Sequence, residues 1–177
     1  MPNQNSKQHD NVVRILFELC NEHIAESGKK VYSKVYADHI GENYKPIILN
    51  AYMPKRKPIG KYYYPDIWTQ VRGKEQFDIF EVWHTEEEFQ GVQDILFASL
   101  VKGIRYFHIV CTGYNLTRDN AKELVNLILR RIHDEEGKRL LDPDNVLIVE
   151  LPDKVKKDKS AIKAHLGIRL EFRSTTS

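Results

Sequence analysis

Two acidic side chains near the middle of the chain have the chemistry of a divalent-cation site. Asp66 follows Pro65 in a tyrosine-rich segment, and Glu81 stands inside the apolar run from Phe80 to Val82. Burying an unpaired carboxylate is costly, so a compensating charge has to lie nearby. Mg²⁺ prefers carboxylate oxygens together with water and substrate phosphate, and a bound metal ion polarises a phosphate and acidifies an attacking water. A divalent cation, Mg²⁺ or Mn²⁺, is therefore one candidate for the compensating charge.

A structural role explains the same pattern. Glu81 would then pair with an arginine or a lysine, or would lie at a solvated end of its strand, and no ion would be needed. Two carboxylates on neighbouring strands do not decide between these explanations by themselves. Three further acids, Glu86, Glu87 and Glu88, are explained by the stabilisation that acidic side chains give to the N-terminus of a helix.

A hairpin has to bring the two central carboxylates together. Residues 61–71 form a predicted strand that a proline interrupts, and residues 76–84 form a second one. The predicted turn at 72–75 is short enough for the two strands to pair antiparallel. Asp66 and Glu81 can then project from adjacent strands into one pocket.

The rest of the chain predicts an α/β fold, a mixed β-sheet flanked by helices in a single domain. Helical or alternating apolar spacing, together with capping and turn residues, places the other elements. These are helices at 9–26, 85–102 and 117–136, and strands at 47–53, 104–112, 145–151 and 166–172. Residues 31–44 stay unassigned between strand and helix. We expect a flexible N-terminus at 1–8, a core at 9–151, and a basic segment with an appended edge strand at 152–177.

The segments Pro65-Asp66 and Glu81-Val82-Trp83, with the hairpin between them, resemble the signature of the PD-(D/E)XK nuclease-like superfamily. The predicted element order over 9–150 is similar to the restriction-endonuclease-like core of that superfamily. The resemblance implies a metal-dependent phosphodiesterase that acts on nucleic acid, on DNA more than RNA. It also implies that Asp66 and Glu81 are the metal ligands, and that an acid on the first helix takes part, for which Asp10 fits best.

A second element of the superfamily has a counterpart further along. The segment Gln93-Asp94-Ile95-Leu96-Phe97 resembles its Q-x-x-x-Y element, with Phe97 where the pattern has tyrosine. The helical wheel places Gln93 near the buried flank of the predicted helix. The resemblance therefore adds Gln93 to the catalytic set.

One position departs from the signature. The pattern requires a lysine two residues after Glu81, and Trp83 stands there instead, with an indole N–H that is only a neutral donor. Lys61 on the adjacent strand is the candidate replacement, although alternation places it opposite to Asp66 unless the proline between them marks a bulge. The same alternation turns His84 away from Glu81. In the alternative explanation, Trp83 is a core or stacking residue in a site that has lost catalysis.

A basic segment supplies the predicted contacts to nucleic acid. Lys55, Arg56 and Lys57 lie together without an acid among them, and Tyr62 follows closely. Basic side chains contact phosphates, and aromatic rings stack on unpaired bases, which contributes about 1–3 kcal/mol per base. A solvated basic loop and ordinary strand packing explain the same residues. The net charge of +2 does not favour either explanation.

Composition narrows the setting in which the protein acts. Cys20 and Cys111 each lie in an apolar run, which indicates buried reduced thiols rather than a disulfide or a zinc site. No apolar run approaches the roughly 20 residues of a membrane span, and the polar start lacks the apolar region of a signal peptide. We therefore expect a cytoplasmic location and no membrane partner, and a homodimer stays open as an assembly.

The sequence leaves three hypotheses about function. The first is a metal-dependent nuclease centred on Asp66 and Glu81. The second is a catalytically inactive protein of the same fold that binds nucleic acid or a protein partner, which Trp83 favours. The third is an unrelated α/β subunit whose edge strand at 166–172 mediates assembly.

Overall fold

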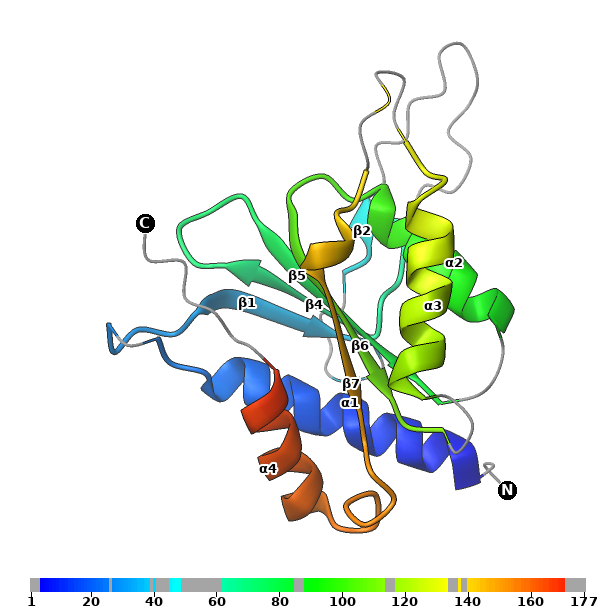
Figure 1. Ribbon diagram of the computed structural model, residues 1–177. Helices are drawn as coiled ribbons and strands as arrows, with labels where there is room; N and C mark the ends of the chain where they lie inside the picture. The colour runs from blue at the N-terminus through cyan, green and yellow to red at the C-terminus, as the bar shows by residue number, and fades with distance from the viewer. Residues whose placement is uncertain are drawn as a thin grey trace.

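The computed structural model describes residues 4–25, 27–38, 40, 45–48, 62–84, 88–113, 117–133, 137 and 140–170. Figure 1 shows a twisted sheet with helices on both of its faces. Within the described residues, no helix is both long enough and apolar enough to cross a membrane. The elements in chain order are α1 (Gln4–Glu22), β1 (Tyr32–Ala37), β2 (Ile47–Ile48), β3 (Tyr62–Tyr63), β4 (Ile67–Val71), β5 (Phe77–Trp83), α2 (Glu88–Ser99), β6 (Ile104–Cys111), α3 (Arg118–Leu129), the 3₁₀ turn η1 (Pro143–Asn145), β7 (Val146–Glu150) and α4 (Lys159–Arg169).

The main sheet has five strands in the order β1-β4-β5-β6-β7. β1, β4 and β5 form an antiparallel meander, and β6 and β7 continue the sheet in parallel with β5. α2 and α3 make the two crossovers, as parallel neighbours require. The short strands β2 and β3 pair with each other outside this sheet. The predicted α/β class, with a mixed sheet and flanking helices, is confirmed.

The two faces of β5 point into two separate hydrophobic clusters. Side chains alternate along a strand, so Phe80 and Val82 pack on the side of α1 and α4. Ile79 and Trp83 pack on the side of α2 and α3. Figure 1 shows the same division of the helices between the two faces. Glu81 lies between Phe80 and Val82, and its side chain therefore points towards α2 and α3.

A second acid of β5 is neutralised inside the sheet. Asp78 accepts hydrogen bonds from Arg105, through Nε at 2.8 Å and through Nη2, and from the Tyr32 hydroxyl at 2.7 Å. A two-point contact with a guanidinium is the arrangement that best compensates the cost of burying a carboxylate. Asp78 is therefore a structural acid whose charge is matched by Arg105.

The first helix begins earlier than the sequence predicts. α1 starts at Gln4 rather than His9 and ends at Glu22, so residues 4–8 of the predicted N-terminal segment belong to the helix. The apolar spacing that locates this helix begins only at Val12, and the polar residues before it add nothing to such a pattern. His9 and Asp10 consequently lie in the second turn of a formed helix.

The predicted edge strand at 166–172 is wrong for its described part, because residues 159–169 form α4. Alternation would bury Ile168 with its neighbours at 166 and 170, but Ile168 is 80% exposed. Burial instead follows the four-residue spacing of Ile162 and Leu166, which is helical. The third hypothesis loses the strand on which its assembly surface depended.

Local contacts explain why this segment is helical and where it docks. Asp158 caps the helix by accepting a hydrogen bond from the Ser160 N–H at 2.9 Å. Two lysines of α4 form ion pairs with α1, Lys159 with Glu18 and Lys163 with Glu22. The basic segment of the sequence thus faces acids of the first helix.

The remaining predictions differ from the structure mainly in their bounds. The strand predicted at 61–71 is divided into β3 and β4 by a bend at Asp66, and the unassigned stretch 31–44 contains β1. Thr117 caps α3 as predicted, by accepting a hydrogen bond from the Asn120 N–H. Residues 49–53 and 85–87, which belong to a predicted strand and a predicted helix start, lie outside the described residues.

A histidine is buried in the centre of the sheet without a polar partner. His108 of β6 stacks on Phe80 with ring centroids 4.2 Å apart and planes 6° apart. Neither ring nitrogen has a hydrogen-bond partner among the described residues. Burial is the main reason why its pKa falls from 6.5 to about 4, with a further lowering from Arg105 and an opposing effect of Asp78. The folded protein therefore keeps His108 neutral.

We predict that replacing His108 with leucine removes part of the acid sensitivity of the fold. The unfolded chain protonates His108 below pH 6.5 and the folded chain only near pH 4, so stability falls between these values as the pH decreases. The loss attributable to this group is about 3 kcal/mol. Urea unfolding from pH 7 to pH 4 should show a shallower decline for His108→Leu than for the wild type. Parallel declines in the two proteins would contradict the prediction.

Candidate functional site

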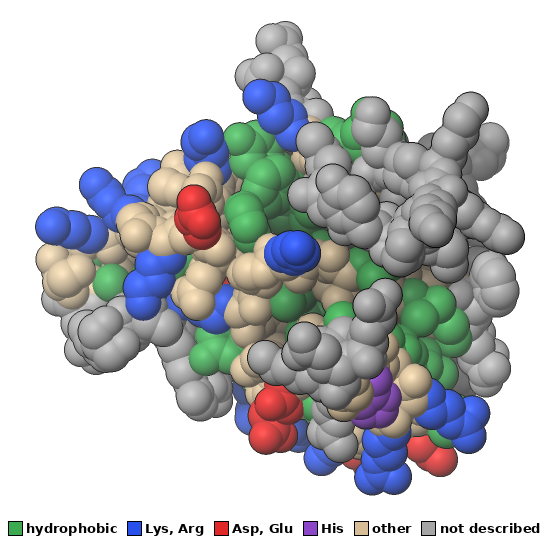
Figure 2. Space-filling view, turned by 90° about the horizontal axis from the view of Figure 1, so that it is seen from above, with side chains coloured by type: hydrophobic (Ala, Val, Ile, Leu, Met, Phe, Trp, Pro, Cys, Tyr) green, Lys and Arg blue, Asp and Glu red, His purple; other side chains and the backbone are tan. Residues whose placement is uncertain are grey.

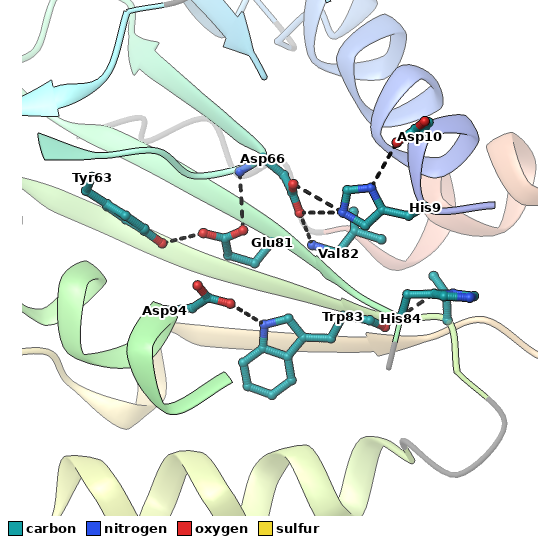
Figure 3. A network of polar contacts seen from close by, with 10 residues as sticks. His9, Asp10, Tyr63, Asp66, Glu81, Val82, Trp83, His84 and Asp94 are labelled. Carbon is teal, nitrogen blue, oxygen red and sulfur yellow. Dashed lines mark hydrogen bonds and ion pairs between the residues drawn. The ribbon is translucent and has the colours of Figure 1, made fainter. Parts of the chain in front are cut away.

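Asp66 and Glu81 meet at the end of the β4–β5 hairpin. The bend that precedes β4 places Asp66 beside β5, because Ile67 pairs with Phe80 in the antiparallel register. The Asp66 N–H donates to Glu81 Oε2 at 3.2 Å, and the Val82 N–H donates to Asp66 Oδ2 at 2.7 Å. Figure 3 shows the Asp66 carboxylate directed to His9 and to the Val82 N–H, and the Glu81 carboxylate directed to Tyr63 and to the Asp66 N–H. The backbone itself fixes their relative position.

Glu81 is buried with neutral partners. The Tyr63 hydroxyl donates to Glu81 Oε1 at 2.5 Å, and Glu81 is 5% exposed. Burial raises the pKa of Glu81 well above its ordinary value, and the neighbouring charges of Asp66 and Asp94 raise it further. Within the described part of the chain, no lysine or arginine forms an ion pair with it. The explanation by a structural ion pair is therefore not supported for Glu81, in contrast to Asp78.

A third acid approaches from α2. Asp94 Oδ2 accepts a hydrogen bond from the indole N–H of Trp83 at 3.0 Å, and Asp94 is 9% exposed. Burial raises the pKa of Asp94 to about 7; the Trp83 hydrogen bond opposes this rise, and Asp66 adds to it. In Figure 3 the Asp94 carboxylate lies on the same side of β5 as Glu81. The site therefore combines three carboxylates from three elements.

A histidine of α1 approaches the site from the other side. His9 Nε2 lies 3.2 Å from Asp66 Oδ1 and 3.3 Å from Oδ2, and Nδ1 lies 3.3 Å from Asp10 Oδ1. The hydrogen bond to Asp66 is the largest cause that raises the pKa of His9 to about 9. At neutral pH both ring nitrogens consequently carry protons and can donate. His9 brings one positive charge to a site with three acids.

The structure separates the two predicted catalytic residues of α1 and α2, Asp10 and Gln93, from Asp66 and Glu81. Asp10 is directed to His9 and is mostly exposed, so it reaches Asp66 only through the imidazole. The prediction that Gln93 lies near the buried flank of its helix is wrong, since Gln93 is exposed. The buried face of α2 instead runs through Asp94, Ile95 and Ala98. A shift of one residue, about 100° on a helix, decides which side chain faces the sheet.

The basic residues that were predicted to contact nucleic acid or to replace the lysine are not among the described residues. They are Lys61, Lys55, Arg56 and Lys57. Tyr62 is 43% exposed, with its ring centroid 6.5 Å from that of Tyr64. Most of the Lys and Arg side chains visible in Figure 2 lie towards the edge of that face, with acidic side chains among them.

His84 has a partner outside the carboxylate group. It contacts the Thr112 hydroxyl at 2.7 Å, and its pKa is lowered, first by burial and then by the charges of His9 and Lys156. Figure 3 shows it turned away from Glu81, as alternation along the strand predicts.

Three residues of the site were not among the sequence-based candidates: His9, Tyr63 and Asp94. His9 ends the apolar face of the first helix, which was a usable signal once an acid of the sheet was known to need a partner. Tyr63 follows Tyr62 in a tyrosine run, and nothing in its type distinguishes it from its neighbours. Asp94 is the second residue of the segment that resembles Q-x-x-x-Y, at a position where that pattern specifies no residue type.

The donor set suits a hard divalent cation. Carboxylate oxygens are the preferred ligands of Mg²⁺ and Mn²⁺. The raised pKa values of Glu81 and Asp94 mean that their ionisation is unfavourable in the folded protein without a compensating charge. Among the described residues, no three or more His, Cys, Asp or Glu side chains are arranged around one point. Asp66 and Glu81 are the two acids of the described chain that would hold such an ion, with water or substrate completing its shell.

Comparisons with known proteins give no relative from which to transfer a function. Neither protein-family models, nor curated proteins, nor solved structures give a significant match to this chain. The functional argument therefore depends on the geometry of the site.

We predict that Glu81→Gln stabilises the protein when no cation is present. Because the pKa of Glu81 is raised in the folded state, the wild type loses stability as the pH rises above about 4.5. The amide can still accept from the Asp66 N–H and donate to the Tyr63 oxygen, but it carries no charge. Urea unfolding in a chelator at pH 8 should show a gain of about 1 kcal/mol.

The matched control is Glu123→Gln, which removes an exposed acid of α3. Its stability should stay within about 0.5 kcal/mol of the wild type. A Glu81→Gln protein that is less stable than the wild type at pH 8 would show that the Glu81 carboxylate is a structural group.

Proposed function

We propose that this protein is a cation-dependent nuclease of the PD-(D/E)XK type, which hydrolyses phosphodiester bonds in nucleic acid at Asp66 and Glu81. The observation that carries the proposal is that each of the two carboxylates accepts a backbone N–H from the segment of the other, Glu81 from Asp66 and Asp66 from Val82, and that Glu81 is buried without a basic partner in the described chain. An antiparallel meander followed by a parallel strand, with helices on both faces, supports it, because the resemblance implies this kind of core.

The chain's own residues have defined tasks in this proposal. Asp66 and Glu81 would hold Mg²⁺ or Mn²⁺, which when bound supplies Lewis acidity to the phosphate and to an attacking water. The Tyr63 hydroxyl and the Asp66 N–H orient the Glu81 carboxylate. The Val82 N–H donates to Asp66 and orients its carboxylate. Each carboxylate oxygen keeps a second lone pair for a cation.

The lysine of the superfamily pattern has no replacement at its own position. Trp83 is 8% exposed and its only polar atom donates to Asp94. Among the described residues, the positively charged group in contact with Asp66 is the His9 imidazolium, which comes from α1. The site thus differs from the pattern in where its cationic side chain originates.

We expect purified protein to cleave DNA with Mg²⁺ or Mn²⁺, and the Asp66→Asn and Glu81→Gln variants to lose at least about 100-fold of that rate, since metal ions contribute several kcal/mol to such reactions. Supercoiled, branched and single-stranded DNA and a single-stranded RNA should be compared, because DNA is only the favoured substrate. Glu123→Gln should retain the wild-type rate. Cleavage that persists unchanged in both site variants would overturn the assignment.

A second function is favoured by the Trp83–Asp94 hydrogen bond, which fills the lysine position with a buried neutral group. In this case the protein binds nucleic acid or a protein partner through the same fold without hydrolysis. Nucleic acid is the partner that the experiment below tests. The expected location is the cytoplasm.

The second function predicts that fluorescently labelled DNA binds without being cut in Mg²⁺ or Mn²⁺. Trp83→Lys should then introduce cleavage, because an ammonium would stand beside Glu81 and Asp94 where the superfamily pattern has one. The double variant Trp83→Lys with Glu81→Gln is the control and should stay inactive. Cleavage by the wild type excludes this second function.

A further inference from the structure

The contact between Trp83 and Asp94 is built into the packing of β5 against α2. The indole N–H donates to Asp94 Oδ2 at 3.0 Å, and both residues are almost fully buried. The ring lies so close to Gly91 that a Cβ at this position would come within 3.2 Å of the indole atoms Cζ2 and Cη2. Gly91 therefore leaves the space that the ring occupies, one helical turn before Asp94.

The carboxylate that Trp83 holds lies on the same side of β5 as Glu81. Figure 3 shows the Asp94 carboxylate directed to the space beside Glu81, with the indole beneath it. The indole N–H of Trp83 is the donor that fixes the orientation of this buried carboxylate.

We propose that Trp83 is a positioning residue that holds Asp94 beside Asp66 and Glu81 as the third carboxylate of the cation centre. The inference rests on the proposed function, since it assigns a role towards the same cation. Trp83 then replaces the lysine of the superfamily pattern by ordering an acid instead of supplying a positive charge. The ligand is a hard divalent cation of the Mg²⁺ or Mn²⁺ class.

Asp94 acts on the cation from outside its direct ligands. The described residues contain no group of three acids gathered around one point, so Asp94 contributes its charge and hydrogen bonds to intervening water. Residues that support metal ligands in this way change affinity by about 10–100-fold when they are replaced. Two variants separate the charge from the donor that orients it.

The first variant is Asp94→Asn, which keeps an oxygen that can accept from the indole and removes only the charge. The second is Trp83→Phe, which keeps an aromatic ring and removes the N–H. We expect each to weaken Mn²⁺ binding about 10-fold in calorimetric titration at fixed pH. In the double variant the losses should be less than multiplicative, because the indole acts only through the carboxylate.

Folding and charge controls accompany the titrations. Thermal unfolding in a chelator establishes that each variant is folded at the titration temperature, and Asp94→Asn decides the question if Trp83→Phe does not fold. Glu123→Gln removes an exposed acid of α3 and should bind Mn²⁺ as the wild type does. Glu81→Gln should abolish binding.

The outcomes distinguish this inference from the proposed function. Wild-type binding that is weakened in both variants, with a coupled double variant, supports both. Wild-type binding that is lost in Glu81→Gln but unchanged in Asp94→Asn overturns the role of Asp94 and leaves the cation centre in place. A wild type that binds neither Mn²⁺ nor Mg²⁺ overturns the cation centre and this inference with it.

Discussion

A carboxylate in the interior of a β-sheet has to be compensated, and β5 contains two that are compensated in opposite ways. Asp78 meets Arg105 and a tyrosine hydroxyl, which is a complete structural solution. Glu81, on the other face of the same strand, meets a tyrosine hydroxyl and a backbone N–H, and the nearest charges are those of other acids. Ionisation of Glu81 therefore opposes folding, as its raised pKa shows.

The order of the strands and helices explains why these acidic side chains lie together. The antiparallel β4–β5 hairpin aligns Asp66 with Glu81, and the parallel crossover through α2 brings Asp94 over the same strand. α1 crosses the opposite face and delivers His9 to Asp66. Acids from the α2 side and a cation from the α1 side therefore meet at one strand end, although the two hydrophobic clusters beneath them are separate.

The fold class and the strand acids were accessible from the sequence because local patterns encode them. The hairpin was predicted by two β-rich runs around a short turn, and an acid between Phe80 and Val82 stood out as an anomaly. The third carboxylate was not accessible, because choosing Asp94 over Gln93 requires the rotation of α2 against the sheet. The role of His9 was not accessible either, since its partner Asp66 lies 57 positions away in the chain.

The C-terminal segment shows where pattern reasoning is ambiguous. Leu166, Ile168 and Leu170 alternate as in a strand, while Ile162, Leu166 and Leu170 repeat as in a helix. Both periods fit a short apolar stretch. The helix is favoured by its capping acid at 158 and by the lysines that pair with acids of α1. Neither feature contributes to hydrophobic periodicity.

The docking of α4 on α1 has a consequence for the order in which the molecule matures. α1 is synthesised first and carries His9, but it shares its buried face and its ion pairs with a helix that leaves the ribosome more than a hundred residues later. Before α4 is made, one flank of α1 stays uncovered. The helix that carries His9 then lacks its packing and ion pairs with α4. A nascent chain would thus complete its acidic pocket on one side well before the histidine on the other side is secured.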